Sequence, residues 1–195
     1  MMEFIFASHN TYKANEINQI IGNEFKIKSL SEINWNDEIE ETGTTLEENA
    51  QLKARTVYRK LKCNCFAEDT GLEVEMLNND PGVYTARYAG ELKDANENMN
   101  LVLSNLQNHK NRNARFRTII CLVVPDKEIL FEGILNGKIG FHKKGNNGFG
   151  YDPIFIPEGY DITLAEMDEK SKNTISHRKN ALLKMQLWLK KMYKL

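Results

Sequence analysis

The feature that most constrains the fold is a pair of long β-rich segments in the second half of the chain. Residues 114–124 are rich in β-branched and other apolar residues, and residues 128–140 return to the same character. Pro125-Asp126-Lys127 stands between them, and a proline followed by an aspartate favours a turn. We therefore predict a β-hairpin with two long strands that extends from a larger sheet.

Shorter elements fill the rest of the chain. Residues 4–6 are predicted to form a first strand, and helical spacing of apolar residues follows it and stops at Gly22. Thr45 and Glu48 form a capping box that begins a helix of about 16 residues, with Thr44 and Glu47 as the overlapping alternative. We also expect strands at 25–30, 65–67, 72–76 and 154–156, loops at 31–45 and 77–93, and helices after Asp94 and at 176–193. Strands interleaved with helices in this way predict an α/β protein.

Composition predicts an ordinary globular protein, because 41% of the residues are hydrophobic and 27% are charged. Lys plus Arg is 26 and Asp plus Glu is 27, so the formal net charge of -1 gives no support for a nucleic-acid or membrane binder. No apolar run approaches the roughly 20 residues that span a bilayer, and the short apolar start lacks a basic leader. We therefore expect a single domain over residues 1–195.

The three cysteines, Cys63, Cys65 and Cys121, cannot all pair within the chain. Reduced thiols in a cytoplasmic protein are the expected state. Zinc binding through Cys63 and Cys65 is the alternative, although the chain has four histidines and no second cysteine pair.

Polar residues between the first strand and the first helix could bind phosphate. A helix that begins after a strand exposes backbone N–H groups and the positive end of its dipole. Asn10 can donate from its amide, and Lys13 lies one turn into the helix. An ordinary helix cap with a solvated lysine is the alternative. The whole segment is Ser8-His9-Asn10-Thr11-Tyr12-Lys13.

Two groups of acidic residues could hold a metal ion. Glu68 and Asp69 follow the apolar run 65–67 and precede Gly71, so we expect a turn that places both carboxylates at the end of a strand. Mg²⁺ prefers a few carboxylates together with phosphate oxygens and water. A turn that Asp69 merely stabilises is the alternative. The second group, Glu38, Glu40 and Glu41, lies in the loop 31–45 and could equally be a solvated loop.

Three further positions carry donors or aromatic rings. Lys53 lies near the apolar face of the helix after Thr45 and could reach into a cleft or extend into solvent. A glycine-rich loop precedes Phe149-Gly150-Tyr151-Asp152-Pro153, which could sandwich a base or form a plain turn. The donors of Lys172, His177 and Arg178 suit an acceptor-rich edge, with a helix cap at Ser176 as the alternative.

Together these segments resemble the inosine triphosphate pyrophosphatase family, and its bacterial branch most closely. The resemblance covers nearly the whole chain in order, and the order and spacing carry it because each piece alone is weak. The segments are SHNTYK at 8–13, EETG at 40–43, ENA at 48–50, KAR at 53–55, EDTGL at 68–72, PGVYTARY at 81–88, GFGYDP at 148–153 and SHR at 176–178.

The resemblance implies an elongated α/β fold, in which helices flank a central mixed sheet and two lobes surround a nucleotide-binding cleft. It also implies an enzyme that hydrolyses ITP, dITP and XTP to the monophosphate and pyrophosphate, and so removes abnormal purine nucleotides from the pool. Members of the family are usually homodimers and use Mg²⁺. The implied partner is therefore a small nucleotide, with neither nucleic acid nor membrane.

The family's site residues carry over onto matching positions. Ser8, His9, Asn10, Thr11, Tyr12 and Lys13 would hold the triphosphate, and Lys53 would also touch phosphate. Glu40 and Asp69 would bind metal, with Glu41 as the alternative to Glu40, and Asp69 beside Thr70 would serve as general base. Phe149, Gly150, Tyr151 and Asp152 would form a wall against the purine, while Lys172, His177 and Arg178 would read its edge. His9 stands where many relatives have a small residue.

Other functions remain as alternatives. The related septum-formation-inhibitor family shares the fold and cleaves other nucleotides, but the motifs of this chain at 149–152 and 176–178 argue against it. A nucleotide sensor without hydrolysis would not need both Asp69 and Lys53. An RNA-binding protein would rest on the basic C-terminal helix alone, and the P-loop signature of kinases and GTPases is absent from the sequence.

Overall fold

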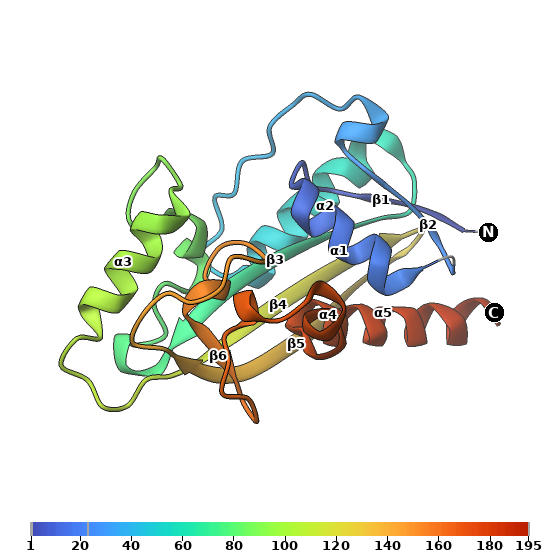
Figure 1. Cartoon of the computed structure of the whole chain (residues 1–195). Coiled ribbons are helices and arrows are strands. Elements are labelled where there is room, and N and C mark those ends of the chain that lie inside the picture. Colours follow the sequence, from blue (N-terminus) through green and yellow to red (C-terminus); the bar gives the residue numbers. More distant parts are fainter. Residues whose placement is uncertain (1, 23, 195) are drawn as a thin grey trace. The chain divides into compact units, whose positions relative to one another are not determined.

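The strands form one mixed sheet (Figure 1). The computed structural model describes residues 2–22 and 24–194 of the chain. Its strands are β1 (Glu3–Phe6), β2 (Lys26–Ser29), β3 (Cys65–Val74), β4 (Asn113–Val124), β5 (Lys127–Ile139) and β6 (Phe155–Pro157). They lie in the order β2-β1-β3-β4-β5-β6, with β1 parallel to β2 and β3, and β5 antiparallel to β6. The predicted α/β class with a mixed sheet is confirmed.

The long hairpin is also confirmed. β4 and β5 are neighbours in the sheet and are separated by Pro125 and Asp126. Asp126 has a φ of 62°, a left-handed conformation that aspartate adopts more readily than most residues. The turn chemistry at this position therefore sets where the two strands reverse.

The helices are α1 (Thr11–Ile21), α2 (Leu46–Leu61), α3 (Ala95–Asn105), α4 (Glu169–Ile175) and α5 (His177–Tyr193). The predicted helix starts are present: the Thr45 side chain accepts from the Glu48 backbone N–H, and Asp94 accepts from the first turn of α3. The capping box is only half formed, because the Glu48 carboxylate accepts from the Thr44 backbone N–H and not from that of Thr45. α4 is not predicted from the sequence, because its seven residues carry almost no apolar pattern. Short 3₁₀ turns at Ser31–Ile33, Glu75–Leu77 and Gly82–Arg87 occupy parts of the predicted loops and of the end of the predicted strand 72–76.

The predicted turn at 68–71 is wrong. β3 runs without a break through Glu68 and Asp69, whose side chains are buried. Cationic side chains surround both carboxylates, so the strand can bury them without leaving either charge unpaired. Gly71 serves a close approach of backbones, since a Cβ there would lie 2.7 Å from the carbonyl oxygen of Gly82.

The chain forms two compact units. Unit 1 contains Met1–Asp69, Thr118–Gly133 and Arg178–Leu195, and unit 2 contains Thr70–Arg117 and Ile134–His177. β3, β4 and β5 each contribute residues to both units. The single domain over 1–195 and the two lobes around a cleft stay predictions.

Each unit has its own hydrophobic core. In unit 1, α1 and α5 pack with β1, β3, β4 and β5, and Phe6 stacks on Phe66 with ring centroids 5.1 Å apart. In unit 2, Val102 of α3 packs with Leu72, Leu135 and Phe155. Across residues 2–22 and 24–194, no helix is both long and apolar enough to cross a membrane.

Candidate functional site

The predicted phosphate segment lies between β1 and α1, as expected from the sequence. Asn10 caps α1 by accepting from the backbone N–H of Lys13 at 3.1 Å, and the Ser8 hydroxyl accepts from the backbone N–H of Asn10 at 3.1 Å. The first turn of α1 carries no acidic residue, so nothing there repels an anion. Tyr12 is exposed, and a ring nitrogen of His9 lies 3.4 Å from the carbonyl oxygen of Asp37.

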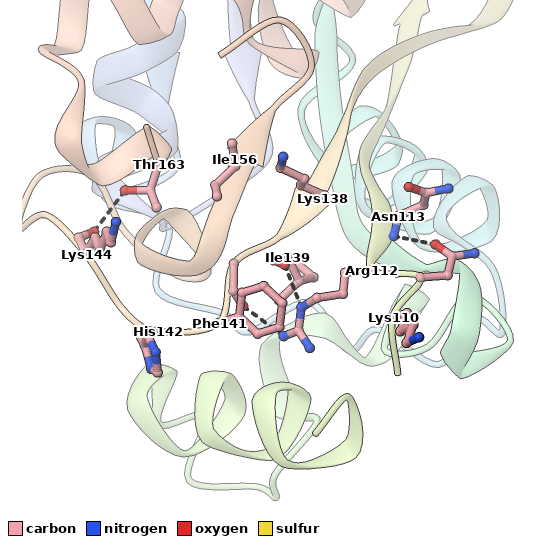
Figure 2. Close-up of a pocket in the computed structure, with 12 residues that line it drawn as sticks. Lys110, Arg112, Asn113, Lys138, Ile139, Phe141, His142, Lys144, Ile156 and Thr163 are labelled. Atoms are coloured by element: carbon pink, nitrogen blue, oxygen red, sulfur yellow. Dashed lines mark hydrogen bonds between the residues drawn. The ribbon is translucent and has the colours of Figure 1, made fainter. Parts of the chain in front are cut away.

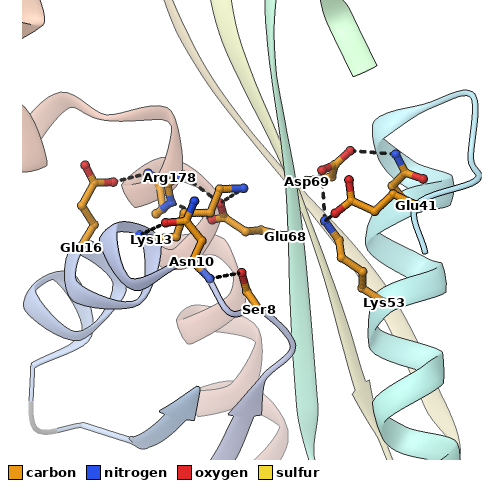
Figure 3. A network of polar contacts seen from close by, with 10 residues as sticks. Ser8, Asn10, Lys13, Glu16, Glu41, Lys53, Glu68, Asp69 and Arg178 are labelled. Carbon is orange, nitrogen blue, oxygen red and sulfur yellow. Dashed lines mark hydrogen bonds and ion pairs between the residues drawn. The ribbon is translucent and has the colours of Figure 1, made fainter. Parts of the chain in front are cut away.

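A buried ion-pair network lies beside this segment (Figure 3). We call it the Glu68 cluster, and its members are Lys13, Glu16, Glu68 and Arg178. The Arg178 guanidinium makes a bidentate contact with Glu68, at 2.7 and 2.8 Å, and a further ion pair with Glu16. The Lys13 ammonium lies 3.1 Å from Glu68. One carboxylate therefore receives two cations.

This arrangement keeps Glu68 ionised. Burial alone would raise the pKa of Glu68, but Arg178 and Lys13 outweigh burial and hold that pKa well below its usual range. Burial likewise opposes the charge on Arg178, while Glu68 and Glu16 raise its pKa above the usual value. Glu68 is thus a poor proton acceptor and a strong partner for cations.

A second network surrounds the neighbouring Asp69 (Figure 3). We call it the Asp69 cluster, and its members are Glu41, Asn49, Lys53 and Asp69. The Lys53 ammonium donates to Glu41 at 2.7 Å and to Asp69 at 3.1 Å. Asn49 donates from its side-chain amide to the other oxygen of Asp69 at 3.3 Å. Lys53 is buried, so its stem reaches inward from α2 and does not extend into solvent.

In this second network two carboxylates share one ammonium. Burial raises the pKa of Asp69, and attraction from Lys53 and Lys13 offsets that effect only in part. For Lys53, burial alone would lower the pKa, but Asp69 and Glu41 outweigh it and raise the pKa above its usual value. Lys53 therefore stays charged, while Asp69 holds a proton more readily than an exposed aspartate does.

The acidic loop contributes Glu41 to this cluster. Glu41 contacts Lys53 directly although it is itself exposed, whereas the neighbouring exposed Glu40 does not belong to the Asp69 cluster. Among residues 2–22 and 24–194, no group of three or more His, Cys, Asp or Glu side chains could hold a metal ion by itself. A metal at Asp69 would therefore need water or substrate oxygens to complete its shell. The three cysteines are free thiols.

The predicted base-binding residues of unit 2 also lie together. The Lys172 ammonium donates to Asp152 at 2.8 Å and lies 4.8 Å from the centre of the Phe149 ring. The backbone N–H of Phe149 donates to the same Asp152 oxygen at 2.9 Å. Gly148 has a φ of 75°, and a Cβ there would meet Asp152 at 2.1 Å, so only glycine fits this turn. The half-buried Phe149 ring is therefore fixed beside a buried ammonium.

Other predicted base contacts are more deeply placed. Tyr151 is buried and donates its hydroxyl to the carbonyl oxygen of Thr85 at 2.8 Å, and burial raises its pKa. His177 is buried and stacks on Phe116 with ring centroids 4.8 Å apart. Thr70 is half-buried in β3.

Arg178 has neighbours that the sequence did not predict. Its side chain is 1% exposed, and its guanidinium donates to Glu16 and Glu68 within unit 1. These contacts connect the start of α5 with α1 and β3, so Arg178 stabilises the packing of these three elements. A contact between Arg178 and a base edge stays a prediction.

A separate cavity of about 470 Å³ lies in unit 2 (Figure 2). Its wall includes Arg112, which donates to the carbonyl oxygens of Leu106, Ile139 and Gly140, each at 2.8 Å. The guanidinium lies 4.6 Å from the centre of the Phe141 ring. None of the predicted site residues lines this cavity. The Arg112 guanidinium donates to backbone carbonyl oxygens of the cavity's surroundings.

Two polar residues of these clusters, Asn49 and Glu16, are not predicted as site residues from the sequence. Asn49 lies one helical turn before Lys53 and is fully buried next to Ala50 on the same helix. A polar residue at a core position of an amphipathic helix was the available signal, because buried polar groups need partners. Glu16 lies in α1 beside Ile17 and is also a buried polar residue, with Arg178 as its partner.

The chain is similar to known proteins over most of its length. The sequence model of the Ham1 family matches residues 4–188. A protein of Flavobacterium psychrophilum described as dITP/XTP pyrophosphatase is 51% identical over 180 residues, covering 92% of this chain and 95% of the relative. The structure of the Staphylococcus aureus Ham1 protein superposes with a TM-score of 0.89 at 40% identity, covering 97% of this chain and 99% of that one. A Ham1 protein from Coxiella burnetii gives a TM-score of 0.89 at 36% identity, covering 98% and 100%.

Proposed function

Because the chain belongs to the Ham1 family, we propose that it hydrolyses dITP, ITP and XTP to the monophosphate and pyrophosphate. The observation that carries the proposal is the Asp69 cluster, where a buried ammonium lies between two carboxylates in unit 1. Such a cluster supplies positive charge for a phosphate and a carboxylate for a proton, which hydrolysis of a phosphoanhydride requires. The similarity to a named dITP/XTP pyrophosphatase over most of both chains supports the same reaction.

Mg²⁺ fits the residues present. Asp69 and Glu41 offer only oxygen ligands, and both lie within 3.1 Å of one ammonium. Mg²⁺ is commonly bound by one or two carboxylates, with substrate phosphates and water completing the shell. We propose that Asp69 holds it together with Glu41 or Glu40. When bound, the ion would polarise phosphate oxygens and lower the pKa of a water molecule.

The protein's own residues then divide the work. Lys13 and Lys53 offset negative charge on the triphosphate, and the amide-rich start of α1 accepts an anion with Asn10 as its cap. A carboxylate cannot both bind the ion tightly and accept a proton, so we assign Asp69 the proton of the attacking water when Glu41 or Glu40 is the main metal ligand; in the metal-free protein, burial raises the pKa of Asp69. Glu68 is unsuited to this step, since Arg178 and Lys13 hold its pKa low. The two carboxylates that could share the metal and base roles are therefore Asp69 and Glu41.

Base selection is assigned to the cluster of unit 2. Phe149 offers a ring for stacking, and Lys172 offers a donor beside it. Hypoxanthine and xanthine carry an acceptor oxygen at position 6, whereas adenine carries a donor there. A site built on such hydrogen bonds can reject the wrong group by about 10⁴–10⁵.

Homodimer formation is part of the same proposal and can be checked by analytical ultracentrifugation.

The test is pyrophosphate release from dITP, XTP, GTP and ATP, measured side by side with Mg²⁺. We expect rapid release from dITP and XTP, and slow release from ATP. Guanine shares the oxygen at position 6, so GTP measures whether the 2-amino edge is also read. Release from modified pyrimidine triphosphates alone would favour the septum-formation-inhibitor type of enzyme. Tight binding of dITP without release would instead identify a nucleotide sensor.

A further inference from the structure

Asn49 belongs to the Asp69 cluster, but no step of the proposed hydrolysis assigns it a role. It lies in α2 one turn before Lys53, and its side chain has no exposed surface. Its side-chain nitrogen donates to Asp69 at 3.3 Å, and its side-chain oxygen accepts from the backbone N–H of Gly43 at 2.8 Å. One buried amide thus connects the strand that carries Asp69 with the segment that carries Glu41.

The contact with Gly43 fixes which way the amide faces. A backbone N–H can only donate, so the atom of Asn49 that faces Gly43 must be its oxygen. The NH₂ group must then face Asp69, where it supports the ionised carboxylate. It binds one carboxylate oxygen and leaves the other directed at Lys53.

Gly43 is shaped for this contact. A Cβ at position 43 would lie 2.6 Å from the Asn49 side-chain oxygen and 2.7 Å from the Cβ of Glu48. Any other residue would therefore push the segment away from α2. Glu41 is two residues earlier, so the Gly43–Asn49 bond also limits where that carboxylate can lie relative to Lys53.

We propose that Asn49 is a positioning residue, which holds Asp69 and the Glu41 segment in the arrangement that hydrolysis requires. The proposal rests on the proposed pyrophosphatase function. A freed Asp69 could rotate away from the attacking water, so the loss should appear in kcat. Asn49 has no exposed surface, so it is not expected to contact the substrate directly. The affinity for substrate should therefore change little.

Asn49→Asp isolates the link to Asp69. The new side chain has the same size and still offers an oxygen to the Gly43 N–H, but it places an acceptor where Asp69 needs a donor. We expect kcat for dITP to fall about 10- to 100-fold, with KM changed by less than about threefold. Asn100→Asp, an identical charge change on the exposed face of α3, is the matched control and should retain full activity.

Two further measurements separate positioning from general damage. In an Asp69→Asn background, Asn49→Asp should lower kcat no further, because the group it positions is already gone. Hydrogen exchange of peptides covering residues 40–45 should stay slow in Asn49→Asp and become fast in Asn49→Ala, which loses the acceptor for Gly43. Gly43→Ala, which leaves Asn49 and Asp69 unchanged, should reduce kcat about tenfold or more.

The outcomes are distinguishable. If the wild-type protein releases no pyrophosphate from any triphosphate, the proposed function fails, while the exchange experiment still tests the Gly43–Asn49 bond. If the wild type is active and folded Asn49→Asp keeps its kcat within about twofold, the positioning role of Asn49 is overturned. Should Asn49→Asp not fold, an unchanged kcat in Gly43→Ala overturns it instead.

Discussion

Glu68 and Asp69 are adjacent in β3, and each lies in its own polar cluster (Figure 3). The two clusters shift the pKa of a buried carboxylate in opposite directions. Successive residues of a strand point to opposite faces of the sheet, so the two side chains meet different helices. Glu68 meets Lys13 of α1 and Arg178 of α5, whereas Asp69 meets Asn49 and Lys53 of α2. One strand therefore presents two carboxylates with different protonation behaviour.

The difference arises from how many cations each carboxylate receives. Glu68 receives two, and its pKa is lowered although it is fully buried. Asp69 shares Lys53 with Glu41, and its pKa is raised. Environments that push neighbouring pKa values apart mark a division between an ionised group and a proton-transferring group. This difference supports the proposal that Glu68 anchors the cations and that Asp69 is the reactive carboxylate.

The largest expected effect is on catalysis in Asp69→Asn. Removing a general base typically lowers the rate by about 10²–10⁴-fold, so kcat for dITP should fall by that factor. Steady-state pyrophosphate release measures it. The cluster around Glu68 does not contain Asp69, so the fold should survive, and an active Asp69→Asn enzyme would remove the distinction between the two carboxylates.

Stability should respond in the opposite way. Glu68→Gln leaves Arg178 buried with a single carboxylate, and breaking a buried pair costs about 3–5 kcal/mol of unfolding free energy. Because the pKa of Glu68 is lowered on folding, its contribution is present above the usual glutamate pKa and is lost only as pH falls through the lowered value. Urea unfolding at pH 7 tests this, and Asp69→Asn should cost less, because burial disfavours the ionised form of Asp69 and Glu41 still pairs with Lys53. Equal stability of the two variants would contradict the account.

Replacing Lys13 and replacing Lys53 should have different effects on stability and catalysis. Lys13→Met leaves Glu68 paired with Arg178, so we expect little loss of stability and a rise in KM for dITP of about tenfold or more. Lys53→Met leaves Asp69 and Glu41 without their shared ammonium, so both stability and kcat should fall. Steady-state kinetics with thermal melting checks both variants. Identical profiles for the two variants would break the comparison.

The smallest effect on function concerns a third titratable group of β3. Cys65 is buried without a charged partner, and burial raises its pKa to about 12, as it does for Cys121. These thiols stay protonated near neutral pH, so a thiol reagent at pH 8 should react with at most Cys63 in the native protein. All three should react after denaturation. Rapid native labelling of all three cysteines would show that the burial of Cys65 in β3 and of Cys121 in β4 is weaker than the structure indicates.

Local patterns in the sequence predicted much of the fold. Turn chemistry at Pro125 and Asp126 gave the hairpin, and Thr45 and Asp94 gave two helix starts, because each signal depends on residues close in sequence. The break expected at residues 68–71 was wrong for the opposite reason. Two adjacent acids favour a turn unless distant cations meet them, and Arg178 is 110 residues away from Glu68.

The candidate site was predicted unevenly in the same way. Motif order supplied Lys13, Lys53 and Asp69, which the structure places in two buried clusters of unit 1. Neither the anchoring of Arg178 by Glu16 nor the bond from Asn49 to Asp69 could be predicted, because each depends on which faces of separate elements meet. The choice of Glu41 over Glu40 as the partner of Lys53 is likewise decided by loop geometry.

The most direct test of the central claim is a carboxyl-carbon NMR titration of the metal-free protein, with Asp69→Asn used to assign the aspartate signal. The account predicts that Asp69 titrates above the usual aspartate pKa and that Glu68 remains ionised well below the usual glutamate pKa. If both groups titrate at ordinary values, or if their order is reversed, the division of roles between these two neighbours is contradicted.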